Sequence, residues 1–147
     1  MMKTDFYLAH PLNMRHKVRD RLQVPLQEMD YAVHNPFYDR SLKPRQDVAL
    51  IDEGRAMLYD ISLARAHDIV KGDLNAINNA GAMIVYLPHP GIGTSMEIFY
   101  AGHVLEKPIF IVTTDAYMRH PWIQTYCSVK RDNIEDIIRA IILEEDV

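Results

Sequence analysis

The sequence contains a single cysteine, Cys127, among its 147 residues. No disulfide can therefore form within the chain, and such scarcity is typical of proteins in reducing compartments. No apolar run approaches the ~20 residues that a membrane-spanning helix needs, and the first residues carry no long apolar segment of the kind found in secretion signals. We therefore expect a cytoplasmic protein without a membrane partner.

Positive charge is also scarce. The chain has 16 Lys and Arg against 20 Asp and Glu, which gives a formal net charge of −4. Its one basic cluster is short and comprises Arg15, Lys17, Arg19 and Arg21. This balance argues against a surface for nucleic acid polymers, although such a cluster beside a pocket could attract a small anion. The length suits a single domain, residues 1–147.

Short apolar segments alternate with helical patterns along the chain. The segments that predict strands are residues 6–9, 31–35, 82–87, 108–113 and 126–129. The segments that predict helices are residues 13–23, 46–79, 95–105 and 133–143. We expect Pro25 to stop the first helix, a break in the second near Asp60 or Gly72, and a loop over residues 114–124. The alternation predicts a single α/β domain, doubly wound around a mostly parallel five-stranded sheet in the flavodoxin-like order 2-1-3-4-5.

Residues 83–107, MIVYLPHPGIGTSMEIFYAGHVLEK, form the most informative segment, because a buried strand passes through a glycine-containing loop into a helix. We expect Glu97 in the first turn of that helix, where free N–H groups and the helix dipole would keep its carboxylate ionised. An ionised carboxylate there can act as a nucleophile or an electrostatic stabiliser. Alternatively, Thr94 and Glu97 form a capping box that only satisfies the helix start.

In a doubly wound sheet, ligands bind outside the carboxyl ends of the strands. Loops that leave those ends carry polar and aromatic candidates for a pocket lining, namely Tyr7, His10, Asn35, Tyr38, Asp39, His120 and Trp122. Two interpretations of residues 120–124 stay open: the segment is only a packed loop, or Trp122 stacks on a nucleobase or reaches into a neighbouring subunit. The histidines lack the close helical spacing of a metal site, so we expect no metal.

Residues 72–112 resemble the nucleoside 2-deoxyribosyltransferase family. The shared features, in order, are an Asp-Leu-Asn-x-Ile helix, an apolar strand, a Gly-x-Gly-x-x-Met-Glu turn, a Tyr-Ala helix and a Lys-Pro strand. The first strand, FYLA, which bears Tyr7, is similar to the first strand of that family.

The resemblance implies that Glu97 attacks C1′ of a 2-deoxyribose and forms a glycosyl-enzyme intermediate, which a second base or water then resolves. It implies that Tyr7 orients Glu97 and that Asp73 contacts the base or helps to protonate it. An ionised carboxylate suits a retaining displacement, and a protonated base is a better leaving group. The resemblance further implies a small nucleoside or nucleotide substrate, no cofactor, and assembly as a homo-oligomer, a dimer or larger.

One position departs from the family. These transferases commonly carry a base-binding Asp six residues before the nucleophile, where this chain has Gly91. Related nucleotide N-hydrolases have a small residue there and hold a 5′-phosphate on the loop, a role that helix N-terminal amides suit. The matching loop residues here are Gly91, Gly93, Thr94 and Ser95, with Arg15 or Arg19 as a possible cation.

Three functions that involve nucleosides or nucleotides therefore remain open, beside a structural or interaction protein that assembles through its apolar helices. The first is cleavage or transfer of the N-glycosidic bond of 2′-deoxynucleosides through Glu97. The second is hydrolysis of 2′-deoxynucleoside 5′-monophosphates. The third is a non-catalytic nucleotide-binding module in which Glu97 only caps its helix.

Overall fold

The computed structural model describes residues 3–57 and 61–145. Its five strands form one sheet in which every neighbouring pair is parallel, in the order β2-β1-β3-β4-β5. The strands are β1 (Asp5–Ala9), β2 (Ala32–His34), β3 (Ala82–Leu87), β4 (Ile109–Thr113) and β5 (Val129–Arg131). The predicted doubly wound sheet and its strand order are confirmed. Every residue of β3 and β4 is buried, as parallel strands covered on both faces require.

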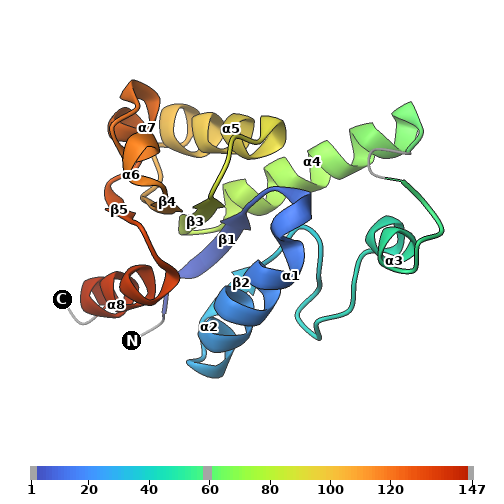
Figure 1. The fold of residues 1–147 in the computed structure, drawn as a ribbon, viewed down its shortest axis with the longest axis horizontal. Helices are drawn as coiled ribbons and strands as arrows, with labels where there is room; N and C mark the ends of the chain where they lie inside the picture. The colour runs from blue at the N-terminus through green and yellow to red at the C-terminus, as the bar shows by residue number, and fades with distance from the viewer. Residues whose placement is uncertain (1–2, 58–60, 146–147) are drawn as a thin grey trace.

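Helices cover both faces of the sheet (Figure 1). The helical segments before β3 are η1 (Leu12–Met14), α1 (Arg15–Val18), η2 (Arg19–Gln23), α2 (Val24–Glu28), α3 (Gln46–Asp52) and α4 (Leu63–Asn79). Those after β3 are α5 (Ile92–Phe99), η3 (Tyr100–Val104), α6 (Asp115–Met118), α7 (Pro121–Tyr126) and α8 (Ile134–Glu145). No helix in the described ranges is both long enough and apolar enough to span a membrane.

The strand alternation divides the core into two layers. Phe6 and Leu8 of β1 pack with buried residues of the segment from α1 to α2 and of α8. Tyr7 and Ala9 point to the opposite face, where α4, α5 and α7 contribute apolar side chains. Tyr7 therefore lies beneath the same helices that carry Asp73 and Glu97.

The first helix continues past Pro25, so the predicted stop before this proline is wrong. Residues 12–28 are helical without a break, and η2 is a π-helical turn in which the Val24 N–H bonds to the Arg19 carbonyl. Proline has no N–H to donate, and a π turn directly before it loosens the regular hydrogen-bond ladder. The chain can thus pass Pro25 without leaving the helix.

The predicted helical stretch over residues 46–79 is two helices, α3 and α4. Gly72 lies inside α4, so a break near Gly72 is wrong, whereas Asp60 lies outside the described residues. The Ser62 side chain accepts the Arg65 N–H at 3.1 Å and thereby caps the start of α4.

Three boundaries in the second half also differ from the prediction. α5 begins at Ile92 rather than residue 95, and β5 is Val129–Arg131 rather than residues 126–129. The expected loop over residues 114–124 contains α6 and α7 instead. Thr114 caps α6 by accepting the Tyr117 N–H, and His120 caps α7 by accepting the Trp122 N–H, each at 3.3 Å.

Candidate active site

Glu97 lies in the second turn of α5, because the helix begins at Ile92 with Gly91 as its N-cap. The expected position in the first turn is therefore wrong. A capping box is also wrong, since Thr94 is the third helical residue and no side chain caps this helix. Glu97 reaches across to β1 instead, where the Tyr7 hydroxyl donates a hydrogen bond to Glu97 Oε2.

A cavity of about 330 Å³ lies at the carboxyl ends of β1 and β3. Six of the residues expected from the sequence line it, namely His10, Asp73, Gly91, Gly93, Thr94 and Glu97. Much of the remaining wall is apolar and comes from η1, α3, α4 and α5, through Leu12, Leu50, Ile51, Ile69, Val70 and Ile92. The cavity thus places two carboxyl groups beside an apolar surface.

Two charged residues of the cavity, Arg45 and Asp47, were missed by the sequence reasoning. Arg45 donates from Nε and Nη2 to the two Asp47 carboxylate oxygens at 2.5 and 2.7 Å, and from Nη1 to the Pro36 carbonyl at 3.1 Å. Its guanidinium also lies 5.4 Å from the Phe37 ring centroid. Asp47 therefore neutralises the Arg45 charge. The sequence did not reveal this pair, because Arg45 and Asp47 lie at the start of a helix and belong to no recognisable motif.

Burial governs the protonation of both catalytic candidates. Burial raises the pKa of Glu97 to about 8, with the Tyr7 hydrogen bond opposing the rise and the Asp73 charge adding to it. Burial raises the pKa of Asp73 to about 6, which Arg45 opposes and Asp47 reinforces. The expected ionisation of Glu97 by the helix start is therefore wrong, because Glu97 lies beyond the first turn and desolvation dominates. Between about pH 6 and pH 8 the two carboxyl groups together hold one proton.

Tyr7 is fully buried in the middle of β1. Burial and the nearby Glu97 charge raise its pKa, so the hydroxyl remains a hydrogen-bond donor throughout the physiological range. The ring of His34, on the neighbouring strand β2, stacks on the Tyr7 ring with centroids 5.4 Å apart and planes 14° from parallel.

His10 is buried at the base of the cavity. Its Nε2 lies 3.1 Å from Asn35 Oδ1, and Asn35 Nδ2 donates to Gln23 Oε1 at 3.0 Å. Burial lowers the pKa of His10 to about 4, so the imidazole is neutral at physiological pH. Asn35 therefore supports His10 from behind and does not line the Glu97 cavity.

Tyr38 and Asp39 do not line the Glu97 cavity either. The Tyr38 hydroxyl donates to Asp52 Oδ2 at 3.1 Å, and Asp39 Oδ1 accepts the N–H groups of Ser41 and Lys43 at 2.9 Å each. The second arrangement is a side-chain-stabilised turn. Together with Asn35, both residues line an adjacent cavity of about 380 Å³.

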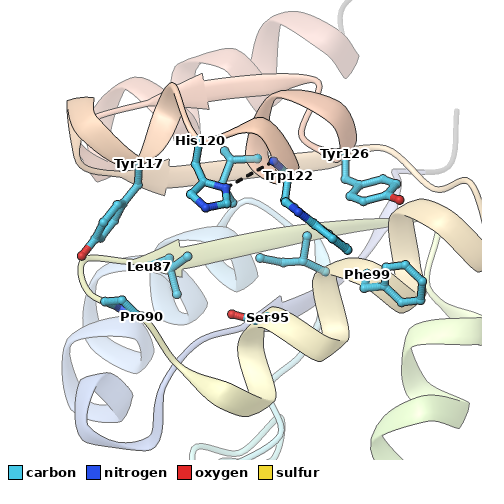
Figure 2. A pocket seen from close by; sticks show the side chains of 10 residues that line it. Leu87, Pro90, Ser95, Phe99, Tyr117, His120, Trp122 and Tyr126 are labelled. Carbon is cyan, nitrogen blue, oxygen red and sulfur yellow. Dashed lines mark hydrogen bonds between the residues drawn. The ribbon is translucent and has the colours of Figure 1, made fainter.

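Ser95, His120 and Trp122 lie on the opposite side of α5 from Glu97. They line a separate, mainly apolar cavity of about 330 Å³ between α5 and the helices α6 and α7. Figure 2 shows Trp122 and Tyr126 across from Phe99 in this cavity, which we call the aromatic groove. The structure therefore does not bring these three residues to Glu97.

The two arginines considered for a phosphate are paired with carboxylates. Arg15 Nη2 lies 2.6 Å from Asp52 Oδ1, and Arg19 Nε lies 2.7 Å from Asp20 Oδ1. Neither lines the Glu97 cavity. Within residues 3–57 and 61–145, no group of three or more His, Cys, Asp or Glu side chains is arranged to hold a metal ion.

Comparison with known proteins links this geometry to enzymes of similar fold. No family model matches the sequence, and no curated protein matches it. The structure is similar to the 2-deoxyribosyltransferase of Bacillus psychrosaccharolyticus, with a TM-score of 0.64 and 17% identity over 90% of this chain and 89% of that one. It is also similar to the CMP N-glycosidase of Clostridium botulinum, with a TM-score of 0.55 and 17% identity over 95% and 98% of the two chains. The resemblance read from residues 72–112 thus extends to the fold.

Proposed function

We propose that this protein cleaves or transfers the N-glycosidic bond of 2′-deoxynucleosides, with Glu97 as the nucleophile. The observation that carries the proposal is the hydrogen bond from Tyr7 to Glu97 at a cavity that also contains Asp73. The similarity in fold to a 2-deoxyribosyltransferase and to a CMP N-glycosidase supports it.

The reaction needs one ionised and one protonated carboxyl group. The Glu97 carboxylate attacks C1′ and forms an ester with the sugar, while the bond from C1′ to the base nitrogen breaks and its electron pair remains on the base. Asp73 supplies the proton that neutralises the departing base. A second base, or water, then attacks C1′ and releases Glu97. Between about pH 6 and pH 8 the pair holds the single proton that this step requires, and the higher pKa places that proton on Glu97 in the free protein. The first step therefore proceeds from the form in which the proton has passed to Asp73 and Glu97 is ionised.

Other features of the cavity suit a nucleoside. The Tyr7 hydroxyl holds one Glu97 oxygen and leaves the other free to react. The apolar side chains from α3 and α4, Leu50, Ile51 and Ile69, offer a surface for the flat face of a base. Gly91 stands where the family has its base-binding Asp, and its backbone lies close to the Pro11 ring. A Cβ added at Gly91 would lie only 3.2 Å from Pro11 Cγ.

Hydrolysis of a deoxynucleoside 5′-monophosphate is the second candidate. The amides at the start of α5 and the similarity in fold to a CMP N-glycosidase favour it. Among the described residues that line the cavity, however, Arg45 is the one Lys or Arg, and Asp47 already neutralises it. An uncharged 5′-hydroxyl needs no cation, so the cavity favours the nucleoside.

A chromatographic assay of released base tests the proposal. The protein is incubated with deoxynucleosides or their 5′-monophosphates, with and without a free acceptor base. We expect turnover of deoxynucleosides and exchange when the acceptor is present. Glu97→Gln should lower turnover by more than about a thousandfold and abolish the covalent deoxyribosyl adduct seen by mass spectrometry.

Glu106→Gln is the matched control, because Glu106 is exposed and lies outside the cavity. It should retain the activity of the unmodified protein. Substantial turnover by Glu97→Gln would overturn the nucleophile assignment. Binding of nucleosides with a rise in melting temperature, but without base release, would indicate the non-catalytic module instead.

A further inference from the structure

His34 covers the flank of Tyr7 that faces the edge of the sheet. β1 lies between β2 and β3, and its register places Tyr7 beside His34 on one side and Met83 on the other. β3 continues into the buried centre of the sheet, whereas β2 is a three-residue strand at its edge. On the side of Tyr7 that faces the sheet edge, its neighbour within the sheet is therefore the imidazole of His34.

The same imidazole separates Tyr7 from two cavities. His34 lines one cavity of about 580 Å³ and a second of about 380 Å³, and Tyr7 lines neither. His34 is partly exposed, whereas Tyr7 is fully buried. Loss of the imidazole would thus leave a path for water from the edge of the sheet to the Tyr7 ring.

We propose that His34 is a positioning residue of the reaction, whose ring holds the Tyr7 hydroxyl on Glu97 and keeps water away from that hydrogen bond. The kinetic part of this inference rests on the proposed function. The physical part does not, because the geometry of Tyr7 and Glu97 exists in the protein without substrate.

The exclusion of water from Tyr7 matters because charged groups surround its hydroxyl. Glu97 on α5, Asp73 on α4 and Arg45 beside α3 all act electrostatically on its hydroxyl, and His34 on β2 stacks on its ring. Partial burial also lowers the pKa of His34, so a neutral ring faces Tyr7 at physiological pH. A neutral aromatic side chain can therefore replace it, whereas a small side chain cannot. Water admitted beside Tyr7 would compete for its hydroxyl and solvate the Glu97 anion.

A double-mutant cycle tests the kinetic part. His34→Ala should lower kcat by about tenfold with little change in KM, the size expected for a weakened hydrogen bond to a charged group. His34→Phe, which keeps a ring over Tyr7, should restore kcat. In a Tyr7→Phe background, where no hydroxyl remains to be held, His34→Ala should cause no further loss. An equal loss in both backgrounds, or no loss in either, would overturn the inference.

Carbon-13 NMR titration of the Glu97 carboxyl, assigned through Glu97→Gln, tests the physical part without turnover. Admission of water should lower the midpoint of this titration in His34→Ala, while His34→Phe should leave it unchanged. If His34→Ala does not fold, His34→Gln, which also lacks the ring, takes its place. An unchanged midpoint in the ring-deleted variant would overturn the role of His34. Absence of turnover in the unmodified protein would overturn the proposed function. The titration would still test whether His34 keeps water away from the hydrogen bond between Tyr7 and Glu97.

Discussion

The hydroxyl of Tyr7 donates a hydrogen bond to the carboxylate of Glu97, which lies 90 residues further along the chain. The pair is brought together because β1 and β3 are neighbours in the sheet and α5 follows β3 directly. Tyr7 points to the face of the sheet that α5 covers, and Glu97 points down from the second turn of that helix. A side chain of strand β1 thus orients the carboxyl group that helix α5 carries.

Tyr7→Phe removes this hydrogen bond and keeps the ring. A hydrogen bond to a charged group contributes about 1.5–3 kcal/mol, so we expect kcat to fall roughly 10- to 100-fold. Circular dichroism should show an unchanged fold, since the phenyl ring fills the same space. Tyr86→Phe is the matched control, because Tyr86 is a buried strand tyrosine on the other face of the sheet. Equal kcat values for the two variants would contradict the orienting role of Tyr7.

The two carboxyl groups predict a bell-shaped dependence of kcat/KM on pH. Activity should rise as pH passes about 6, where the pair loses its first proton, and fall as pH passes about 8, where it loses its second. Asp73→Asn should abolish the fall at high pH, because Glu97 is then the only one of the two that titrates. Stopped assays across pH 5–9 in one mixed buffer measure both limbs. A descending limb that persists in Asp73→Asn would assign the acid to another group.

The sheet could be predicted because its signal is local. Residues 82–87 are continuously apolar and stop at Pro88, and the observed strand has these bounds. Boundaries set by single contacts were missed. The π turn before Pro25 and the cap that His120 provides for α7 leave no periodic pattern in the sequence.

The site could be predicted only where residues follow a strand or a motif. Glu97 was found from the strand-loop-helix pattern, Tyr7 from its strand, and Asp73 through the resemblance, and the fold brings the three together. Arg45 was missed because no pattern determines the path of its loop. Ser95 was grouped with Glu97, which lies two positions further along the same helix. Positions separated by two are about 200° apart around a helix axis, so these two side chains lie on opposite faces.

Glu97→Gln should stabilise the protein, increasingly so as pH rises. The folded protein holds a proton on Glu97 up to about pH 8, whereas the unfolded chain loses it near pH 4.5, so this group lowers stability progressively across that interval. Glutamine carries no charge and still accepts the Tyr7 hydrogen bond. We expect a gain on the order of 1–3 kcal/mol at pH 8 and little gain at pH 5. Calorimetry at both pH values measures it, and a gain independent of pH would contradict the raised pKa.

Two helix glycines provide a matched test of where substrate binds. A Cβ added at Gly93 in α5 or at Gly72 in α4 would meet no atom within 4 Å, and removal of a helix glycine stabilises by about 0.5–1 kcal/mol. Gly93 lines the Glu97 cavity and Gly72 does not. Gly93→Leu and Gly72→Leu should therefore both raise the melting temperature.

Only Gly93→Leu should fill the cavity and raise KM, by about tenfold or more, which corresponds to ~1.4 kcal/mol of lost binding. Steady-state kinetics with a single deoxynucleoside, together with thermal melts of the same preparations, separate the two effects. Because both substitutions introduce the same side chain into a helix, a general effect of leucine on folding would appear in both variants. Equal KM values for the two would show that substrate does not enter the cavity beside Glu97, whichever residue performs the chemistry.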